Sequence, residues 1–530
     1  MIESPALNSP DISHRRRHSG TGRGWWWAAV VVLIPSLIPP ATLTWIVASG
    51  GIDIGIPAGR LATLFVNTLG LTIAVTATAL LIGIATAYLT ARTDIPGRTT
   101  WMLIAALPLV VPSYVAALTI IAATGSGGVV DEYLGWAIPT PYGFAGSWLA
   151  LSVFLAPMVH LTLVPALRRI DPSTEEAAIG LGASRLKTLV TVTIPQARPA
   201  LIAAGLLVGL YTVSDFGAVS LLRFDTFTRA IYTLYVGQID RTPAIALSLI
   251  LMVMAVAIIL AQRKVTTRAT YYSRRPRAGA GLLHLRGWSR GAATFALAAY
   301  SFLTLVVPIG VMTRWLLRGL SVGQGAGQFW DETARSVGVA LAAAVVGVIA
   351  AFPVAMVTAR IQGRASRLVG SAVWASYAIP HVAVGVAVVA FALSAARPLY
   401  QSLALLIATY TVMFLAQSMA STEDSLLRAS PDLEHAARGL GSGPLTTLRR
   451  IILPLAKPGL LAGAALIFLS VMKELPATLL LRPNGFETLA VRIWSTTGEG
   501  FYTQAATAGL LLLAVSVLPL LAVTRRDISD

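Results

Sequence analysis

The chain has 530 residues, of which 56% are hydrophobic and only 12% are charged. A water-soluble domain carries about a quarter charged residues, so this composition excludes an ordinary soluble protein. The net charge of +17 would suit a nucleic-acid-binding protein, but the basic residues are concentrated in a few loops, as in membrane proteins, and we expect no nucleic-acid partner. The chain has no cysteine, which excludes disulfides and thiolate metal sites.

The amino-terminal residues differ from the rest of the chain. Residues 1–24 are polar, contain four arginines and lack an apolar core, so we predict a disordered, basic cytoplasmic tail. The stretch at 25–48 is too long for the core of a signal peptide and has no clear cleavage site. We therefore predict that it is retained as the first membrane span.

Apolar runs of about 20 residues, the length that crosses about 30 Å of hydrocarbon as a helix, recur along nearly the whole chain. They predict an all-α membrane protein with about twelve transmembrane helices in the lipid bilayer. The predicted spans are 25–48, 61–91, 101–123, 144–167, 199–221, 244–262, 291–315, 333–360, 368–394, 399–420, 458–481 and 504–524. An even number of spans places both termini on the same side.

The charges of the loops indicate which side is cytoplasmic. Residues 263–290 hold eight lysines and arginines and no acidic residue, whereas the loop at 124–142 holds Asp131 and Glu132 and no basic residue. By the positive-inside rule, we expect a multi-pass protein of the inner membrane with both termini and the 263–290 linker in the cytoplasm. We predict that this basic linker separates a first half, 25–262, from a second half, 291–530.

Matched residues indicate that the two halves are copies of one unit. The offset between partners is 268 before the loop at 124–142 and 259 after it. Because each half holds six predicted spans, the copies share one orientation, and we predict two parallel six-helix repeats. The matched pairs are Gly70 with Gly338, Ala91-Arg92 with Ala359-Arg360, Pro112 with Pro380, Ala177-Ala178 with Ala436-Ala437, Gly182 with Gly441, Pro195 with Pro454, and Pro199 with Pro458.

Two matched cytoplasmic loops, 171–195 and 430–454, have the pattern of a short helix, a glycine and a second short helix. Asp171 or Ser430 followed by proline is a good helix start, and Gly182 or Gly441 ends the first helix. Small residues allow another backbone to approach closely, and apolar residues supply contact area. A duplicated loop of this kind favours docking of a symmetric partner over the alternative, an ordinary linker at the membrane surface.

These loops resemble the Glu-Ala-Ala signature of importer-type ABC permeases. The first loop fits from Glu176 to Pro195. The second departs at the acidic position, where His435 stands and Glu434 comes one residue early, about 100° around a helix. The resemblance assigns coupling to the ATPase to Glu175, Glu176, Ala177, Ala178, Gly182 and Pro195 in the first loop, and to Glu434, His435, Ala436, Ala437, Gly441 and Pro454 in the second.

The resemblance extends over about 55–525 and implies the permease fold, with partners that this chain lacks. In the family, such loops are coupling helices seated in two ATP-binding cassette subunits, and an extracytoplasmic binding protein delivers the substrate. The segment from Gly182 to Thr188 lacks the glycine before lysine of a phosphate-binding loop. We therefore expect a transport subunit rather than an enzyme, with no cofactor of its own and with ATP and Mg on the partner subunits.

Polar residues within two matched spans are candidates for a transport pathway or gate. They are Ser214 and Asp215 in the span at 199–221, and Lys473 and Glu474 at the matched place in 458–481. A charge near the centre of a bilayer costs about 2.5–3.5 kcal/mol on insertion scales, so such residues usually face a pathway or pair with one another. The alternative is a network that holds helices together, for example a Lys473–Asp215 pair.

Two histidines, His160 and His381, lie in or beside predicted spans. Neither has a carboxylate or a second histidine near it in the sequence. We interpret them as hydrogen-bonded helix contacts and predict no metal site.

The segments at 473–483, 214–219 and 224–228 resemble the fused permeases of ferric-iron uptake systems. The resemblance implies import of ferric iron, whereas fused permeases for thiamine and for aminophosphonates share the architecture and remain alternatives. A secondary transporter driven by an ion gradient is a further alternative, but it does not need the duplicated loops. We find no pair of carboxylates or nucleophile and base that would indicate a membrane enzyme.

Overall fold

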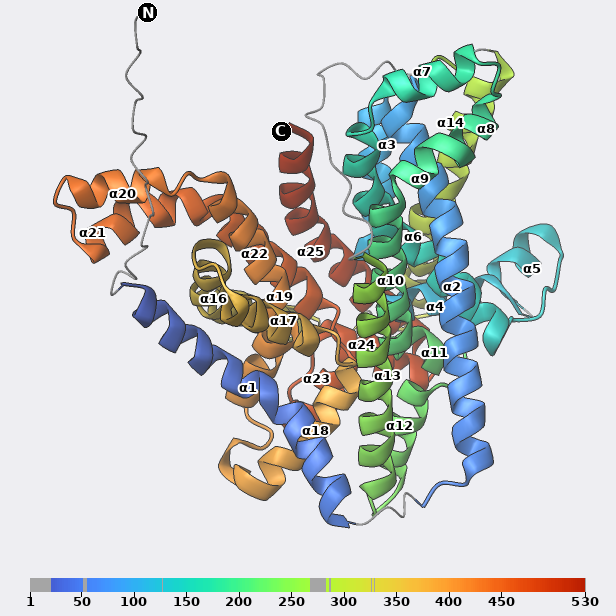
Figure 1. Cartoon of the computed structure of the whole chain (residues 1–530). Helices are drawn as coiled ribbons and strands as arrows, with labels where there is room; N and C mark the ends of the chain where they lie inside the picture. Colours follow the sequence, from blue (N-terminus) through green and yellow to red (C-terminus); the bar gives the residue numbers. More distant parts are fainter. Residues whose placement is uncertain are drawn as a thin grey trace, which may run out of the picture.

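The structure is a computed structural model that describes residues 21–50, 55–125, 127–266, 283–285, 287–325, 327 and 329–529 (Figure 1). In this part of the chain the secondary structure is helical, apart from one isolated parallel bridge between Thr93 and Leu283. The predicted tail, 1–24, lies mostly outside the described residues, and so does most of the predicted linker, 263–290. The all-α fold class is confirmed.

The helices of the first half follow the predicted spans in order, with shorter helices between them. They are α1 (Thr21–Gly50), α2 (Ala58–Arg92), α3 (Arg98–Ala106), the 3₁₀ turn η1 (Leu107–Val110), α4 (Ser113–Ala123), α5 (Val129–Leu134), α6 (Phe144–Arg168), α7 (Pro172–Gly180), α8 (Arg185–Thr188), the π-helical turn η2 (Leu189–Thr193), α9 (Ile194–Gln196), α10 (Arg198–Ser214), α11 (Gly217–Leu221), α12 (Phe227–Gly237) and α13 (Thr242–Thr266).

The second half has a closely similar order. Its elements are α14 (Trp288–Ser301), the π-helical turn η3 (Phe302–Val306), α15 (Val307–Ser321), α16 (Trp330–Arg360), α17 (Arg364–Tyr377), α18 (His381–Ala395), the 3₁₀ turn η4 (Arg397–Leu399), α19 (Leu403–Arg428), α20 (Asp432–Gly439), α21 (Pro444–Thr447), the π-helical turn η5 (Leu448–Ile452), α22 (Leu453–Met472), α23 (Pro476–Leu481), α24 (Leu489–Gly498) and α25 (Tyr502–Ser529).

The helices have the length and composition of membrane spans. Within the described ranges, eight are long and apolar enough to cross a bilayer, or eleven if each of three bent pairs is one span. Large apolar side chains on their outer faces are exposed, among them Ile73, Leu81 and Ile349, as a lipid environment allows. The last predicted span, 504–524, falls in α25, whose apolar stretch Tyr502–Val517 is shorter. The chain is a multi-pass helical membrane protein, and the count of twelve spans stays a prediction.

Two predicted spans are wrong in their shape. The span at 101–123 consists of two helices that meet at 91°, and the span at 368–394 consists of two that meet at 98°. The bends lie at Pro112 and Pro380, the residues just before α4 and α18. A proline has no N–H for the helical hydrogen bond and favours an extended residue before it, as at Val111, where ψ is 116°. The matched prolines therefore mark a bend in each half.

The predicted spans 199–221 and 458–481 are also wrong as continuous helices. In the first, α10 ends at Ser214 and the short α11 begins at Gly217. In the second, α22 ends at Met472 and α23 begins at Pro476. Pro476 has no N–H to continue α22, but it fits the first position of a new helix, where that N–H would be unpaired anyway. The breaks fall at the polar residues singled out in the sequence.

Three long helices form the packed centre of each half. α2, α6 and α10 pack together in the first half, and α16, α19 and α22 pack together in the second (Figure 1). Gly83 of α2 lies directly against Val159 and the backbone of Ala156 in α6, so a side chain at this position would overlap them. The close approach of α2 and α6 therefore depends on a glycine.

The first helix of each predicted half packs against the other half. α1 contacts α16, α17 and α18, and Ala29 of α1 is fully buried there. In return, α14 contacts α3, and α15 contacts α4. Figure 1 shows α1 beside α16–α18, well away from α6 and α10. The two halves are thus interlocked by their leading helices.

The described end of the predicted linker binds to the first half. The backbone of Leu283 pairs with the residues around Thr93, and Asp94 accepts hydrogen bonds from the Leu285 N–H at 2.8 Å and from the His284 ring at 2.9 Å. The Leu285 N–H, and then the His284 ring, lower the pKa of Asp94. The linker is therefore attached beside the end of α2.

We expect Gly83→Ala to lower the midpoint temperature of unfolding in detergent. The new methyl group would overlap Val159, and overpacking of this kind costs about 1–3 kcal/mol. The matched control is Gly70→Ala on the same helix, where nothing lies within 4 Å of the added carbon. The control should keep or raise the midpoint, because alanine favours a helix by about 0.5–1 kcal/mol over glycine. Equal midpoints for the two variants would contradict the close packing of α2 and α6.

Candidate functional site

The two predicted loops have the helix–glycine–helix form in the structure. α7 and α8 follow α6, α20 and α21 follow α19, and Figure 1 shows both loops at the same end of the molecule. Asp171 caps α7 by accepting a hydrogen bond from the Ser173 N–H at 3.0 Å. Gly182 and Gly441 separate the paired helices at φ of 87° and 82°, in the left-handed region that favours glycine.

The surface of both loops is apolar and unusually exposed. Leu181 is 90% exposed and its match, Leu440, is 88% exposed. Leu186 and Leu445, which follow the glycines, are also exposed. Exposed apolar groups gathered on a projecting loop indicate a contact surface for another protein.

The predicted coupling residues divide into an exposed group and a buried group. Glu176, Ala177, Gly182, Pro195, His435, Ala436, Gly441 and Pro454 are exposed, and Ala178 is partly buried. Glu175, Glu434 and Ala437 are buried. The exposed group is available to a partner, whereas the buried acids hold the loops in place.

In the first loop, Glu175 forms a buried ion pair with Arg92 at the end of α2. Glu175 also accepts a hydrogen bond from the Thr193 hydroxyl at 2.6 Å, and Arg92 donates to the Ile170 carbonyl at 3.4 Å. Since α2 has 35 residues, it is about 52 Å long and extends beyond the hydrocarbon to reach this loop. The longest described helix of the first half is thus fixed directly to the exposed loop.

The second loop has the same ion pair. Glu434 accepts from Arg360, at the end of α16, at 2.9 Å, and Arg360 also donates to the Ala429 carbonyl at 3.2 Å. Glu434 matches Glu175 at the offset of 259, so His435 matches Glu176. Glu434 therefore takes the place of Glu175, and both halves keep this buried acid. Only the exposed acid, Glu176 in the first loop, is replaced by a histidine in the second loop.

Within the membrane region, Asp215 and Glu474 cap the short helices that follow them. Asp215 Oδ1 accepts hydrogen bonds from the N–H groups of Ala218 at 3.0 Å and Val219 at 3.4 Å. Glu474 Oε1 accepts from the N–H of Ala477 at 3.1 Å. These carboxylates satisfy N–H groups at helix starts, for which lipid offers no acceptor.

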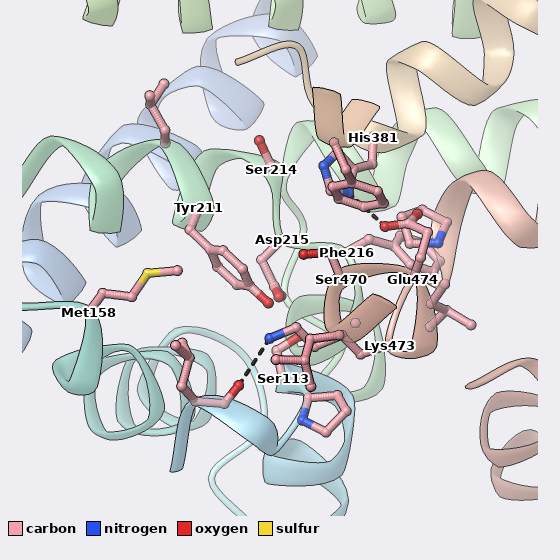
Figure 2. A pocket seen from close by; sticks show the side chains of 18 of the residues that line it. Ser113, Met158, Tyr211, Ser214, Asp215, Phe216, His381, Ser470, Lys473 and Glu474 are labelled. Atoms are coloured by element: carbon pink, nitrogen blue, oxygen red, sulfur yellow. Dashed lines mark hydrogen bonds and ion pairs between the residues drawn. The ribbon is translucent and has the colours of Figure 1, made fainter. Parts of the chain in front are cut away.

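Each of these carboxylates also contacts the residue after a bend-forming proline. Ser113 lies beside Asp215 in the lining of one cavity, and His381 Nδ1 lies 2.7 Å from Glu474 Oε2 (Figure 2). Ser113 and His381 match at the offset of 268. The same contact therefore occurs in both halves with different side chains. The residue types did not predict it, although the position after each matched proline was the signal that could have shown it.

Lys473 makes a contact that the first half does not repeat, because its match is Ser214. Its ammonium donates a hydrogen bond to the backbone carbonyl of Leu109, in η1 of the first half, at 3.0 Å (Figure 2). Among the described residues Lys473 forms no ion pair, so the Lys473–Asp215 pair that we considered is not formed. This lysine instead links the two halves through a neutral group.

These residues line one cavity of about 210 Å³ between the two halves. The first half contributes residues of η1, α4 and α10, and the second contributes residues of α17, α19 and α22. All four predicted pathway residues line it, namely Ser214, Asp215, Lys473 and Glu474. The structure therefore brings together two pairs of residues that are 259 positions apart in the sequence.

An aromatic cluster adjoins the cavity. Phe216 lines the cavity, and its ring centre lies 4.8 Å from that of Tyr232 in α12 and 5.0 Å from that of Trp494 in the second half. α12 extends toward the end opposite α7 and α20 (Figure 1). The cluster thus joins the halves on the side of the cavity away from the two loops.

The predicted histidine contacts are present in the structure. His160 is fully buried and lies 3.2 Å from the Thr86 hydroxyl. His381 has Glu474 as its partner, 93 residues further along the chain, which its sequence neighbours could not reveal. A search of the described residues finds no group of three or more side chains that could hold a metal ion.

Long apolar helices, two matched exposed loops at one end and a cavity between two halves that holds a few polar side chains are together typical of a membrane transport protein. The sequence matches the family described as binding-protein-dependent transport system inner membrane component twice, over residues 79–271 and 343–526. The two matches cover more than half of the chain, so the chain belongs to this family. The predicted resemblance to a permease with two fused transport domains is confirmed.

Individual relatives are permeases of several transport systems. The Fe(3+)-transport system permease protein FbpB 2 of Haemophilus influenzae is 29% identical over 465 residues, which are 87% of this chain and 89% of that protein. The ferric transport system permease protein FbpB of Actinobacillus pleuropneumoniae is 24% identical over 466 residues, 82% of this chain and 66% of that protein. A putative 2-aminoethylphosphonate transport system permease protein, PhnV of Salmonella typhimurium, is 26% identical over 199 residues, 38% of this chain and 75% of that protein.

We expect Arg92→Met to destabilise the first loop strongly, because it leaves the buried Glu175 without its cation. Breaking a buried pair in this way costs about 3–5 kcal/mol, whereas replacing both partners by apolar residues is often neutral. The double variant Arg92→Met with Glu175→Leu should therefore recover much of the loss. Hydrogen exchange of α7, together with the midpoint of thermal unfolding, measures both effects.

The matched control is Arg428→Met, which breaks the exposed pair with Asp424 on α19. An exposed pair within a helix contributes only about 0.3–0.5 kcal/mol, so the midpoint should hardly change. Equal effects of Arg92→Met and Arg428→Met would show that the buried pair does not anchor the loop.

Proposed function

We propose that this chain is the membrane-spanning subunit of an ATP-driven ABC importer that moves ferric iron from an extracytoplasmic binding protein into the cytoplasm. The observation that carries the proposal is the pair of loops at one end of the molecule, each with an exposed leucine after its first helix and a buried Arg–Glu anchor. Two such surfaces suit two copies of one partner, which we assign to two ATP-binding cassette subunits that bind ATP and Mg.

The orientation follows from the loop charges. We place the two docking loops, both termini and the 263–290 linker in the cytoplasm, and the aromatic cluster of Phe216, Tyr232 and Trp494 on the external side of the cavity. Matched contacts at the bends and breaks of the two halves support two parallel repeats related by an axis along the membrane normal. Closure of the ATP-binding subunits would then pull on α2 and α16 through Arg92 and Arg360.

Ferric iron is the favoured cargo because two relatives named as ferric permeases match more than four fifths of the chain. The relative named for 2-aminoethylphosphonate matches 38% of it, which keeps an aminophosphonate as the second candidate. Import of thiamine has only the shared architecture in its favour. A secondary transporter would leave the duplicated, exposed loops without a use.

The first test is affinity purification of the tagged chain from its own cells in mild detergent. We expect an ATP-binding subunit at about two copies per chain. A stable chain that is repeatedly recovered alone would overturn the ABC importer in favour of a gradient-driven carrier. The recovered complex, reconstituted with its binding protein, should hydrolyse ATP faster with the ferric-loaded protein than with the empty one. Stimulation by 2-aminoethylphosphonate instead would assign the second candidate.

We expect Gly182→Val or Gly441→Val to reduce the stimulated ATPase activity of that complex about tenfold or more. Each glycine has a positive φ that a β-branched residue adopts at a cost of more than about 1–2 kcal/mol, so the second helix of the loop would shift. The controls are Gly180→Val and Gly439→Val, within α7 and α20, where nothing lies within 4 Å of the added carbon. Full stimulation in the Gly182 and Gly441 variants would exclude coupling through these loops.

A further inference from the structure

We propose that the cavity between the two halves binds a small anion through Lys473, so that the cargo passes this point as an oxyanion or as an anion-coordinated complex rather than as a bare cation. The iron-specific part of this inference depends on the proposed function, whereas the anion site itself does not.

The negative groups of the cavity are already engaged by donors. Asp215 Oδ1 accepts from two backbone N–H groups, and Ser113 lies beside this carboxyl group. Glu474 uses one oxygen to cap α23 and the other for His381. A cation that needs several oxygen ligands would have to displace these contacts and leave helix N–H groups without an acceptor within the apolar span, which costs several kcal/mol for each group.

The positively charged Lys473 ammonium, by contrast, makes fewer hydrogen bonds in the described part of the chain than it has N–H donors. An ammonium has three N–H donors, and the described residues show one hydrogen bond for Lys473, to the carbonyl of Leu109. A carbonyl does not neutralise its charge. The matched residue is the neutral Ser214, so the repeat supplies one ammonium rather than a symmetric pair. A charge that is costly to insert in a membrane and is left without a counter-ion indicates a ligand of opposite sign.

Neutral polar groups line the same cavity as this ammonium. Tyr211 points toward it from α10, and Ser470 lies one turn before it on α22 (Figure 2). The Ser470 hydroxyl donates to the side-chain oxygen of Gln417 at 3.0 Å, and the Gln417 amide donates to the Tyr377 hydroxyl at 3.3 Å, so an anion would share these donors with their present acceptors. Hydroxyl, amide and ammonium groups are the donors that bind oxyanions. None of them is a strong ligand for a hard metal ion such as Fe³⁺ without deprotonation.

The size of the cavity limits the ligand. One water molecule occupies about 30 Å³ in the liquid, so a cavity of about 210 Å³ holds a tetrahedral oxyanion with part of its hydration shell, or a small metal complex. The chemical class is therefore a compact oxyanion of the phosphate, sulfate, phosphonate or carboxylate type, either free or coordinated to iron.

The test measures anion binding by the purified chain alone, in lipid nanodiscs, by isothermal titration and by thermal unfolding. The probes are orthophosphate, ferric citrate and citrate, with sodium chloride at matched ionic strength as the reference. We expect orthophosphate or ferric citrate to bind the wild-type chain and to raise its midpoint above that in chloride. Orthophosphate binding identifies a free oxyanion, and binding of ferric citrate without binding of orthophosphate or citrate identifies an iron-coordinated anion.

Lys473→Met should weaken this binding about tenfold or more, because it removes a charged hydrogen bond, while Lys473→Arg should keep it within a few fold. The matched control is Lys457→Met, the same change at an exposed position of α22, the helix that ends just before Lys473, which should leave binding unchanged. Without ligand, Lys473→Met should unfold at the wild-type temperature or above, since it removes a charge that has no counter-ion.

Three outcomes would overturn the proposal. They are no anion-dependent stabilisation of the wild-type chain, equal binding by wild type and Lys473→Met, and a lower midpoint of Lys473→Met without ligand, which would make Lys473 a structural link to Leu109. Because the assay contains no ATP-binding subunit and no binding protein, its failure is distinct from a failure of the proposed import function. That function is tested by co-purification and by ATPase stimulation.

Discussion

Hydrocarbon offers no partner for a broken backbone hydrogen bond, and this constraint determines how the centre of the molecule is built. Prolines at 112, 380 and 476 interrupt helices within the apolar spans, and every interruption exposes N–H or C=O groups. The chain satisfies them from within, with Asp215 and Glu474 as helix caps and with Lys473 on a carbonyl of the opposite half. The polar residues of the cavity are therefore a consequence of the breaks, and the cavity lies where the breaks of both halves meet.

Two other residues connect the membrane region with the exposed loops. α2 and α16 run as continuous helices, α16 with Pro353 inside it, to Arg92 and Arg360, whose guanidinium groups bind the buried acids of the loops. In the proposed importer, the continuous helices would transmit a displacement of a loop along their axes toward the cavity, and the bent pairs beside them would accommodate it at their prolines.

The sequence predicted those features that depend on neighbouring residues. Apolar run lengths located the spans, and the short-range pattern around Gly182 and Gly441 located the loops and their turns. It did not predict contacts that only the folded chain creates. Glu474 meets His381 across 93 residues, and Lys473 meets Leu109 across 364. The bends were not predicted, because one proline hardly changes the hydropathy averaged over a window. Pro112 and Pro380 were predicted only as matched positions of the two repeats.

The exchange of leading helices between the halves has a consequence for biosynthesis. α1 is synthesised before the other described helices, yet its packing partners extend to the end of α18, about 345 residues after the end of α1. At about 5–20 residues per second, roughly 17–70 s pass between the synthesis of α1 and that of this binding surface. During that interval α13 is the contact that the first half offers to α1, and the face that packs on α16–α18 has no partner. Assembly of the first half is therefore completed by the second, and fusion of both halves in one chain ensures that the partner always arrives.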